Sequence, residues 1–524
     1  SNTIFVRFKV IKSPANINAD NADIVIWTTT PWTIPGNRAI AYSPNSNYAR
    51  IKVTGVIEDT LVELGDEIIV AEALLEQVIK EAGISDHTVI KIFIGSELSG
   101  TICAHPFKGQ GYEFDVPLLA GDFVEMDTGS GFVHIAPGHG SDDWELGIAN
   151  DISIPDTIDG SGLYYENIPI FGGIHVFKAD EIVIRHLRDT GALLASNKIL
   201  HSYPHSWRSK APLIFRNTPQ WFISMDNNDL RDKALKAIDD TVFYPATGQN
   251  RLKGMIETRP DWCVSRQRAW GVPITVFVHK KSGQVLRDQT VLNRIIEAIE
   301  KEGADAWFNS DASRFLGPDN KMDEYEQVTD ILDVWFDSGS SHSFVLESRE
   351  DLSWPATLYL EGSDQHRGWF HSSLLESCGT RGRAPYEGVL THGFVMAADG
   401  QKMSKSLGNI TSPQEVIEKH GADILRLWVV GSDYSDDLRI GEDIIKHHSD
   451  IYRRLRNTLR FLLGNLDGFI QSEKIPYDEM PELERWVLHR IYELDKMIRD
   501  SCNNYEFHSL FTELHNFCAI DLMF

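Results

Sequence analysis

The hydrophobic and polar positions divide the chain into stretches of different character. Residues 1–23 hold few large apolar side chains after Val10 and end in the polar run SPANINADNAD, so they are predicted to form a connector. Between 24 and 200, short β-branched runs such as IVIWTTT and TVIKIFIG are separated by Gly, Asn and Asp turns, which is typical of a compact β-rich domain. Leucines at helical spacing over 71–82 predict one helix within it.

The next stretches are more mixed. Residues 201–278 are dense in Trp, Arg and Pro, and they include a predicted helix over 229–238. Residues 279–330 are predicted to form a small insertion, with a helix over 291–302 followed by a charged loop. Neither stretch shows the regular alternation of the preceding domain, so a change of domain is expected near residue 200.

The pattern of apolar residues changes again over 331–440. Strand candidates at 358–362 and 388–395 alternate with helical stretches, and this pattern indicates an α/β sheet. The run Ser412–Glu415 has the form of a capping box with proline at the first helical position, so a helix is predicted to begin there. The whole chain is therefore expected to be a multidomain α/β protein.

From 441 to 524 the pattern is purely helical. The first helix is predicted to end at Gly464, and its apolar stripe consists of Ile444, Ile445, Ile451, Tyr452, Leu455, Leu459, Leu462 and Leu463. Further helices are predicted over 483–498 and from Phe507 onward, the last of them still apolar at Phe524. Because a bundle helix should not stop with its apolar face unfinished, and because position 1 is not Met, we expect the chain to be a fragment.

Composition and charge narrow the class of protein. With 524 residues, 42% of them hydrophobic, the chain is large enough for three or four domains and too apolar to be disordered. Neither an 18-residue apolar run nor a signal peptide is present, so no membrane segment is expected. The net charge of −26 disfavours indiscriminate binding of polyanions but leaves room for a local basic track. Five widely spaced cysteines without a CxxC pair indicate a reducing, cytoplasmic setting and no thiolate zinc site.

The strongest local motif is Lys402-Met403-Ser404-Lys405-Ser406, which follows a predicted strand and a turn. Two ammonium groups three residues apart on a glycine-bounded loop suit a polyphosphate, because they can stabilise the charge that develops on a leaving pyrophosphate. Lys402 and Lys405 are therefore the candidate catalytic residues. The alternative is a solvated charged loop without a ligand.

A second candidate site stands where the predicted strand 358–362 opens onto a helix. Ligands of open α/β sheets bind at the carboxyl ends of strands, where glycine permits close approach and polar side chains can hold ribose hydroxyls or an α-amino group. The candidates for adenylate, ATP or amino-acid binding are Glu361, Gly362, Asp364 and Gln365. The alternative is that Ser363 or Asp364 serves only as the N-cap of the helix.

A third block, Asp333-Val334-Trp335-Phe336-Asp337-Ser338-Gly339, carries a tryptophan beside a predicted strand. Trp335 and Trp369 are candidates for the walls of an apolar side-chain pocket. A tryptophan next to a strand is more often simply part of the core, and without further evidence that interpretation is favoured.

These blocks, in this order, resemble the class I aminoacyl-tRNA synthetases, and within them the isoleucine branch. The run Trp27-Thr28-Thr29-Thr30-Pro31-Trp32-Thr33 has the isoleucine form, where the valine and leucine branches typically have TTRPET and TTRPDT. The blocks at 261–268, 333–339 and 362–366 indicate the same branch. The resemblance extends over nearly all of the chain.

The resemblance implies a domain plan and an activity. It implies a partial Rossmann-type class I catalytic fold with an inserted β-rich editing domain at 24–200 and a C-terminal α-helical bundle. Residues 201–278 become a return segment into the catalytic core, 331–440 its second half with the KMSKS loop, and 441–524 a partial anticodon-binding bundle. The implied activity is that of an isoleucine–tRNA ligase, which uses ATP with Mg²⁺, L-isoleucine and tRNA(Ile), as a cytoplasmic monomer.

An editing domain compensates for the limited selectivity of the amino-acid pocket. A pocket that accepts isoleucine excludes valine by only ~1–3 kcal/mol, a limit for which this very amino-acid pair is the standard example. An ester hydrolase that removes misattached valine needs a held water, hydroxyl groups and a carboxylate for the substrate ammonium. By resemblance the editing residues are Thr28, Thr29, Thr30, Thr33, His134 and Asp143. Asp143 is expected to bind the α-amino group, His134 to contact the terminal ribose, and the threonines to position water or the carbonyl.

Two further features have open interpretations. Arg453, Arg456 and Arg460 interrupt the apolar stripe of the first bundle helix and either form a solvated face or contact tRNA phosphates. Arg266 and Arg268 serve either packing or RNA. Consecutive threonines are also common on strands for structural reasons alone.

Two departures from the family matter. The HIGH tetrapeptide of class I synthetases is absent from the sequence, so we expect this chain to hydrolyse Val-tRNA(Ile) weakly and not to activate isoleucine. The run Ser206-Trp207-Arg208-Ser209 stands where some relatives bind zinc with CxxC, and serine is a poor zinc ligand, so no metal is expected. A non-catalytic RNA-binding paralogue and a metal-dependent hydrolase built on GHGSDD are the alternative hypotheses.

Overall fold

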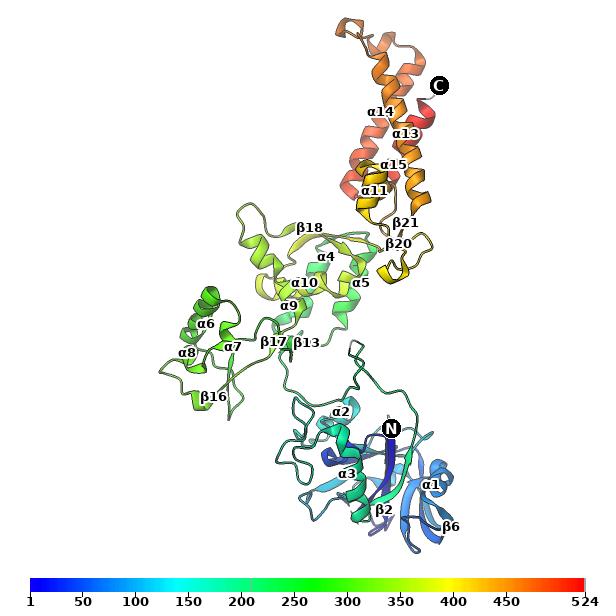
Figure 1. Ribbon diagram of the computed structural model, residues 1–524, viewed down its shortest axis with the longest axis vertical. Helices are drawn as coiled ribbons and strands as arrows, with labels where there is room; N and C mark the ends of the chain where they lie inside the picture. The colour runs from blue at the N-terminus through cyan, green and yellow to red at the C-terminus, as the bar shows by residue number, and fades with distance from the viewer. Residues whose placement is uncertain (208, 523–524) are drawn as a thin grey trace. The chain divides into compact units, whose positions relative to one another are not determined.

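The structure is a computed structural model that describes residues 1–207 and 209–522. Arg208, Met523 and Phe524, which the sequence analysis named in its predictions, lie outside this part. The chain divides into two compact units, Ser1–Pro219 and Gln220–Phe524 (Figure 1). Each unit contains both helices and strands, which confirms the mixed α/β class.

Unit 1 is built around one large sheet. Its strands are β1 (Asn2–Lys12), β2 (Asp23–Thr28), β3 (Ala39–Tyr42), β4 (Asn47–Val56), β5 (Glu67–Ala71), β6 (Ile84–Ile94), β7 (Ile102–Ala104), β8 (Asp115–Ala120), β9 (Phe132–Ile135) and β10 (Leu193–Lys198). Its helices are α1 (Leu75–Ala82), α2 (Ser141–Ala149) and α3 (Val176–Asp189), with short 3₁₀ turns η1 (Pro31–Gly36), η2 (Glu72–Leu74) and η3 (Gly95–Leu98). The β-rich texture predicted for 24–200 and the helix predicted within 71–82 are confirmed.

The strand order shows that the prediction of a connector over 1–23 is wrong. The order is β6-β4-β5-β2-β1-β7-β8-β3-β9, and β10 also pairs with β1. β1 is therefore a central strand, with β2 along one side and both β10 and β7 along the other. Asn2 lies opposite Lys198 in the antiparallel β1–β10 pair, and the amino group of Ser1 donates to the carbonyl of Ile199 at 2.9 Å.

The physical reason is that β1 is buried on both faces from Thr3 to Phe8. Ile4, Val6 and Phe8 are fully buried in the larger core of unit 1, while Phe5 packs on the other face into a second core that includes side chains of β4, β5 and α1. Full burial of one such side chain contributes about 1.5–3 kcal/mol, so the strand is a main source of stability. The polar run after it forms the turn to β2, in which Ile17 is also buried.

The turn before β9 is packed closely against two other strands. The Ala71 N–H donates to the carbonyl of Ser130 at 2.9 Å, and the Tyr48 hydroxyl donates to the carbonyl of Gly131 at 2.8 Å. Gly131 has a φ of +79°, and a Cβ at this position would lie 2.2 Å from the Cβ of Ala71. Glycine is therefore required at this point. The turn fixes the start of β9, the strand that carries His134.

Unit 2 contains several smaller sheets and most of the helices. Its strands are β11 (Phe222–Ile223), β12 (Val242–Tyr244), β13 (Trp262–Cys263), β14 (Ser265–Arg266), β15 (Phe277–His279), β16 (Tyr325–Gln327), β17 (Ile331–Leu332), β18 (Ala356–Gly362), β19 (Tyr386–His392), β20 (Val395–Ala397) and β21 (Leu438–Ile440). Its α-helices are α4 (Leu230–Asp239), α5 (Thr247–Glu257), α6 (Gln289–Glu302), α7 (Ala306–Asn309), α8 (Ala312–Leu316), α9 (Val334–Gly339), α10 (Trp369–Arg381), α11 (Pro413–His420), α12 (Ala422–Val430), α13 (Glu442–Asn465), α14 (Glu482–Asn504) and α15 (Phe507–Asn516). Short 3₁₀ or π turns are η4 (Asn227–Asp229), η5 (Met322–Glu324), η6 (His342–Glu347), η7 (Ser363–Arg367), η8 (Lys405–Leu407), η9 (Gln471–Glu473), η10 (Tyr477–Glu479) and η11 (Phe517–Asp521).

The central sheet of unit 2 is parallel, with the order β12-β19-β18. Parallel strands need a crossover, and α10 supplies the one between β18 and β19. The core of this region includes the buried Phe243, Leu374 and Val389 together with side chains of α4 and α5. The α/β sheet predicted within 331–440 is confirmed, and the helix predicted over 229–238 is α4.

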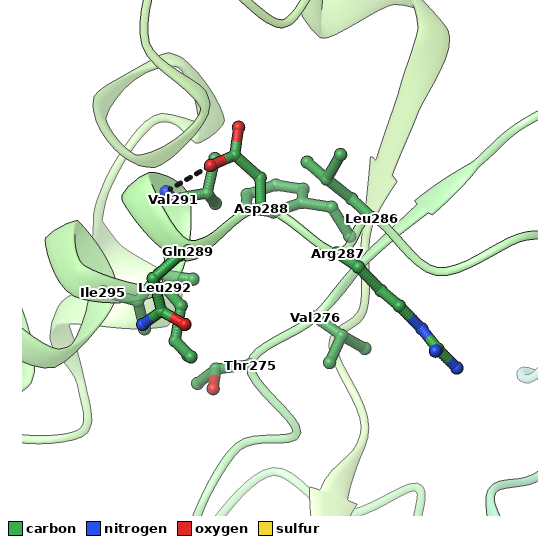
Figure 2. A pocket seen from close by; sticks show the side chains of 10 residues that line it. Thr275, Val276, Leu286, Arg287, Asp288, Gln289, Val291, Leu292 and Ile295 are labelled. Atoms are coloured by element: carbon green, nitrogen blue, oxygen red, sulfur yellow. Dashed lines mark hydrogen bonds between the residues drawn. The ribbon is translucent and has the colours of Figure 1, made fainter.

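The region 279–330 forms a small body with its own core around the fully buried Trp307. Its predicted helix is α6. A cavity of about 430 Å³ lies beside α6. Figure 2 shows its lining, which includes the apolar side chains of Leu286, Leu292 and Ile295. Asp288 accepts from the backbone at the start of α6, at 3.3 Å from the Val291 N–H, and so acts as a helix cap. No residue of this cavity belongs to the candidate sites.

The KMSKS loop lies between β20 and α11. β20 pairs in parallel with β21, and the helices α11 and α12 connect them along the chain. The predicted start of a helix at Pro413 is confirmed. The capping box is wrong, because the Ser412 hydroxyl donates to the Gln414 side chain at 3.0 Å instead of capping the helix.

The last part of unit 2 contains α13, α14 and α15. The apolar stripe predicted for α13 is buried in its first half, at Ile445 and Ile451, but Leu459, Leu462 and Leu463 are exposed. The helices predicted over 483–498 and from Phe507 are α14 and α15. Within the described ranges, none of the helices combines the length and the apolar character needed to cross a bilayer.

Candidate functional site

The predicted threonines do not all lie on a strand. Thr28 is the last residue of β2, Thr29 is in a bend, and Thr30 immediately precedes η1, which contains Thr33. The Thr28 hydroxyl oxygen accepts from the Thr30 N–H at 3.1 Å, and this contact tightens the turn. Within the described residues, no hydrogen bond is formed by the hydroxyls of Thr29 or Thr30. Because Thr28 only accepts, three hydroxyl groups remain able to donate at this turn.

Thr33 and His134 are brought into direct contact, with Oγ1 and Nε2 2.8 Å apart. The Thr33 hydroxyl donates to the carbonyl of Thr30 at 2.9 Å, so its oxygen must accept from the imidazole. His134 therefore carries its proton on Nε2. Its Nδ1 is then an acceptor, and Asn37 Nδ2 donates to it at 3.3 Å. The geometry thus assigns one tautomer to the ring.

His134 is also kept uncharged. Burial lowers its pKa to about 4, helped by the nearby His139. The side chain is only 8% exposed, and both ring nitrogens are bound within the protein. Asn37 is completely buried, and its Oδ1 has no hydrogen-bond partner within the described ranges. This amide oxygen is thus a buried acceptor beside the histidine that no described donor satisfies.

Asp143 reaches the same region from the first turn of α2. Its Oδ2 accepts from the Ala136 N–H at 2.7 Å, immediately after the end of β9 and two residues from His134. Burial raises the pKa of Asp143 to about 6, although the Ala136 N–H opposes the shift, and the neighbouring Asp142 raises it further. The carboxylate is thus held in place, and among the residues that the structure describes no cation pairs with it.

The loop between β9 and α2 packs against η1. The rings of Trp32 and His139 meet edge to face at 5.1 Å, and a Cβ at Gly36 would lie 3.0 Å from the His139 ring. His139 Nδ1 lies 3.0 Å from the carbonyl of Phe215 and Nε2 lies 2.7 Å from the Thr157 hydroxyl. Both nitrogens of His139 are therefore used for packing this loop. The structure brings the threonine turn, His134 and the Asp143 loop together around η1.

A metal centre finds no support in this arrangement. Within the part of the chain that the structure describes, no three His, Cys, Asp or Glu side chains gather as a metal site requires. The expectation of no zinc remains a prediction, since one residue of the Ser206–Ser209 run is outside the described part.

The second candidate site lies at the carboxyl ends of β18 and β19. Gly362 is paired with His392, and a Cβ at Gly362 would lie 2.7 Å from Asp364 Oδ1. Asp364 and Glu361 are exposed, and the Gln365 Oε1 accepts from the Trp369 N–H at 3.0 Å at the start of α10. At this strand end Glu361 and Asp364 are therefore exposed, whereas Gly362 is buried and Gln365 is partly used at the start of α10. Neither Ser363 nor Asp364 caps a helix with its side chain.

The two tryptophans lie close to each other but differ in their surroundings. The ring of Trp369 stacks on that of Tyr359, with the ring centroids 4.0 Å apart and an angle of 7° between the planes. The Trp369 Nε1–H donates to the Ser341 hydroxyl at 2.9 Å. Trp335 is 40% exposed on α9, and its ring would lie 2.8 Å from a Cβ at Gly368. Trp369 is thus partly core, whereas Trp335 presents a free apolar surface beside the strand end.

Both lysines of the KMSKS loop are exposed. The loop is shaped by Asn409, whose Oδ1 accepts from the Ser404 N–H at 2.9 Å and whose Nδ2 donates to the Lys402 carbonyl at 3.3 Å. Within the described residues, no hydrogen bond or ion pair links Lys402 or Lys405 to the strand-end residues. The loop therefore presents two unpaired ammonium groups on an internally fixed backbone.

The arginines have different surroundings. Arg266 forms an ion pair with Asp333 at 2.6 Å, and Asp333 also caps α9 by accepting from the Trp335 N–H, so Arg266 serves packing. Arg453 lies 3.1 Å from Asp450 on the same helix, with 70% of its side chain exposed. Arg456 and Arg460 are exposed on α13. Their contact with tRNA stays a prediction.

Comparison with known proteins identifies the family. The family model described as "tRNA synthetases class I (I, L, M and V)" matches residues 13–441. The chain belongs to this family. The resemblance found in the sequence is thereby confirmed, and the strand-end turn and the KMSKS loop both lie within the matched range.

Curated relatives of this synthetase chain are isoleucine–tRNA ligases. The chain is 53% identical over 533 residues to the isoleucine–tRNA ligase of Pelagibacter ubique. It is 52% identical over 536 residues to the isoleucine–tRNA ligase of Gluconobacter oxydans, and both alignments cover all of the chain. The chain spans 58% and 56% of the length of these relatives. Among solved structures, the Agrobacterium radiobacter K84 LeuRS ternary complex is 16% identical, with 100% of this chain and 58% of that chain covered and a TM-score of 0.39. This structural likeness is too low to support an argument about geometry.

Two residues of the synthetase chain that the structure places in these sites are not among the predicted site residues. Asn37 donates to Nδ1 of His134, and its position seven residues after Thr30 in the same motif was the available signal. His392 ends β19 opposite Gly362, and its place within the predicted strand 388–395 was the corresponding signal.

Proposed function

We propose that this chain is part of an isoleucine–tRNA ligase, in which unit 1 hydrolyses Val-tRNA(Ile) and unit 2 supplies the adenylate platform and the KMSKS loop. The observation that carries the proposal is the 53% identity, over the whole chain, to an isoleucine–tRNA ligase. The substrates are tRNA(Ile), L-isoleucine and ATP with Mg²⁺, and the protein acts in the cytoplasm as a monomer.

In the editing reaction, water attacks the ester carbonyl that joins valine to the terminal ribose. The ionised carboxylate of Asp143 binds the α-ammonium group, because it is held by the Ala136 N–H and has no cation of its own. The hydroxyls at Thr28, Thr29 and Thr30 are oriented toward the water or the developing oxyanion. Thr33 acts as a positioning residue, since its hydroxyl is fully used in holding His134.

In this proposal His134 acts as a neutral group that shapes the site. With a pKa lowered to about 4, the ring does not accept a proton from water at neutral pH as a general base of matched strength would. Its buried position between Thr33 and Asn37 supports a role as a rigid wall that excludes the extra methylene of isoleucine. One methylene of that kind changes rates by about 10- to 200-fold.

The decisive test is the hydrolysis of Val-tRNA(Ile) and Ile-tRNA(Ile) by the purified chain. We expect the valyl ester to be hydrolysed at least about tenfold faster than the isoleucyl ester, because only valine fits the wall formed by His134. Release of labelled amino acid is measured against spontaneous deacylation without protein. Rates equal to that background for both esters would instead favour a non-catalytic RNA-binding module.

For unit 2 we propose that Lys402 and Lys405 bind the phosphates of ATP and stabilise the leaving pyrophosphate. Each substitution, Lys402→Ala or Lys405→Ala, is expected to weaken the binding of Mg·ATP about tenfold, because a charge-assisted hydrogen bond contributes ~1.5–3 kcal/mol. Titration calorimetry measures the affinity. Lys419→Ala on α11 is the control, since Lys419 is equally exposed but lies outside the loop. Unchanged affinity in both loop variants would contradict this role.

A further inference from the structure

The peptide group of Trp32 is held from two sides by residues outside the motifs found in the sequence. Trp32 lies in η1 between Thr30 and Thr33, and it is only 5% exposed. Its N–H donates to Asp180 Oδ1 at 3.3 Å. Its carbonyl accepts from the hydroxyl of the buried Tyr164. These two residues lie 148 and 132 positions away along the chain, so distant segments of unit 1 clamp the threonine turn.

Asp180 fills the place that the hydroxyl of Thr30 would ordinarily take. The first N–H groups of a helix have no partner inside it, and a threonine at the N-cap typically accepts from the second or third of them. Thr30 is the N-cap of η1, yet its side chain makes no capping hydrogen bond. Trp32 is the second residue of η1, and its N–H is bound by Asp180 instead. The Thr30 hydroxyl is thereby left available to a substrate.

Asp180 is well placed to act as a cap from another element. It belongs to α3, and the neighbouring Ala179 and Val183 are buried in the same core as Trp32. Burial raises the pKa of Asp180 to about 6, although the Trp32 N–H and the Asn2 side chain oppose the shift. Ionised and neutral carboxyl groups both carry an oxygen that can accept from an N–H. The cap therefore does not depend on the charge of Asp180.

We propose that Asp180 is a positioning residue of the editing reaction, which caps η1 in place of Thr30 and so keeps the Thr30 hydroxyl free for the water or the oxyanion. This inference rests on the proposed function of unit 1 and extends it to a residue of α3. Without Asp180, the Trp32 N–H takes the acceptor that the N-cap position offers, which is the Thr30 hydroxyl oxygen. The hydroxyl then turns toward the end of η1 and is lost to the substrate.

The first test is the deacylation of Val-tRNA(Ile). Asp180→Ala should lower kcat at least about tenfold, because one oriented donor in such a site contributes roughly 100-fold or more. KM should stay within about twofold, since the ammonium ligand Asp143 is unchanged. Asp180→Asn retains an oxygen for the Trp32 N–H and should keep kcat within about threefold of wild type. Glu181→Ala, at the adjacent exposed carboxylate of α3, is the control and should keep full activity.

Two outcomes of this test would overturn the proposal. An unchanged kcat in Asp180→Ala would show that the cap has no bearing on the reaction. A loss in Asp180→Asn as large as that in Asp180→Ala would assign the effect to the charge of Asp180 rather than to its hydrogen bond with Trp32.

A double-mutant cycle tests whether Asp180 acts through Thr30. Thr30→Ala alone should lower kcat about tenfold or more, because it removes one of the oriented hydroxyls. In the Asp180→Ala background the same substitution should lower kcat by less than about twofold further, since the hydroxyl is already diverted. Two losses that simply multiply would show that the residues contribute independently, and this result would overturn the role assigned to Asp180.

Hydrogen exchange of the Trp32 amide tests the cap without any substrate. The amide is observed by NMR in the chain labelled with ¹⁵N-tryptophan, and its signal is identified by its loss in Trp32→Phe. Thr30→Ala alone should leave its exchange rate unchanged, whereas Asp180→Ala/Thr30→Ala should increase it at least about tenfold, because both acceptors are gone. Faster exchange in Thr30→Ala alone would identify Thr30 as the cap and overturn the proposal. Absence of deacylation by wild type would contradict the proposed function, while this exchange result would still decide whether Asp180 caps the turn.

Discussion

Asp143→Asn is expected to lower the hydrolysis of Val-tRNA(Ile) by roughly 100-fold, because losing one partner of a held charge pair costs ~2–5 kcal/mol. The asparagine oxygen still accepts from the Ala136 N–H, so the loop between β9 and α2 keeps its shape. The variant therefore removes the charge that binds the α-ammonium group and little else. Deacylation under conditions of limiting enzyme measures the effect.

The same carboxylate predicts a pH dependence. The pKa of Asp143 is raised to about 6, and only its ionised form attracts the ammonium group. Between pH 5 and pH 7 the rate of editing should therefore increase with pH and level off above about 6. In Asp143→Asn this inflection should disappear. A wild-type profile that is flat across this range would contradict the assignment of Asp143 as the ammonium ligand.

Asp142 offers a matched control, since it is the adjacent carboxylate on the same helical turn but is exposed. Asp142→Asn should keep nearly all editing activity, and its pH inflection should remain but move to slightly lower pH, because Asp142 no longer raises the pKa of Asp143. A measurement of stability separates an effect on function from an effect on folding. Because the pKa of the Asp143 carboxylate is raised in the folded state, the folded protein becomes less stable as pH increases through about 6. Asp143→Asn should accordingly be at least as stable as wild type at pH 7, despite its loss of activity.

Gly131→Ala is expected to destabilise unit 1 by about 3–5 kcal/mol. A side chain in the left-handed region costs ~1–2 kcal/mol, and forcing an extra methyl into a packed site typically adds ~1–3 kcal/mol. Here the new Cβ would be 2.2 Å from the Cβ of Ala71, so the turn must move. That movement would also break the bond between the Ala71 N–H and the Ser130 carbonyl. Urea denaturation monitored by circular dichroism measures the loss.

Gly100→Ala separates the two contributions. Gly100 has a similar φ of +84°, but nothing lies within 4 Å of a Cβ at that position. Its substitution should cost only the conformational part, about 1–2 kcal/mol. Similar losses for the two variants would mean that the turn before β9 is not tightly packed. Because this turn fixes the start of β9, Gly131→Ala should also slow editing, whereas Gly100→Ala should not.

Several elements of the fold were predictable because their patterns are local. The β-branched runs of unit 1 and the apolar periodicity of α6 and α14 are each sufficient to specify a strand or a helix. β1 was misjudged as part of a connector although IFVRFKVI contains an apolar alternation. Its central place depends on partners up to 196 residues away in β10, and pairing at that distance leaves no local signal.

The candidate sites likewise combine features that the sequence predicts with features that it does not. The motifs of Thr28–Thr33, His134 and Asp143 could be found in the sequence because unusual residue types occur together. The tautomer of His134 could not, because it depends on the order of hydrogen bonds from Thr30 through Thr33 to the ring. The sequence also could not predict that Leu459 and Leu463 are exposed, because periodicity predicts an apolar face but not whether another element covers it.

The pairing of β1 with β10 has a consequence for how unit 1 can be combined with another protein. Cα atoms directly opposite in an antiparallel pair are ~4.5–5.5 Å apart, and Asn2 and Lys198 are such a pair. The first strand of this body thus begins, and its last strand ends, at nearly one point. A module with adjacent ends can interrupt a host fold at a single surface loop without spreading the flanking segments apart. A graft of this body into a carrier protein must also keep the segment after β10, because Phe215 and Arg216 contact His139 and Ile158.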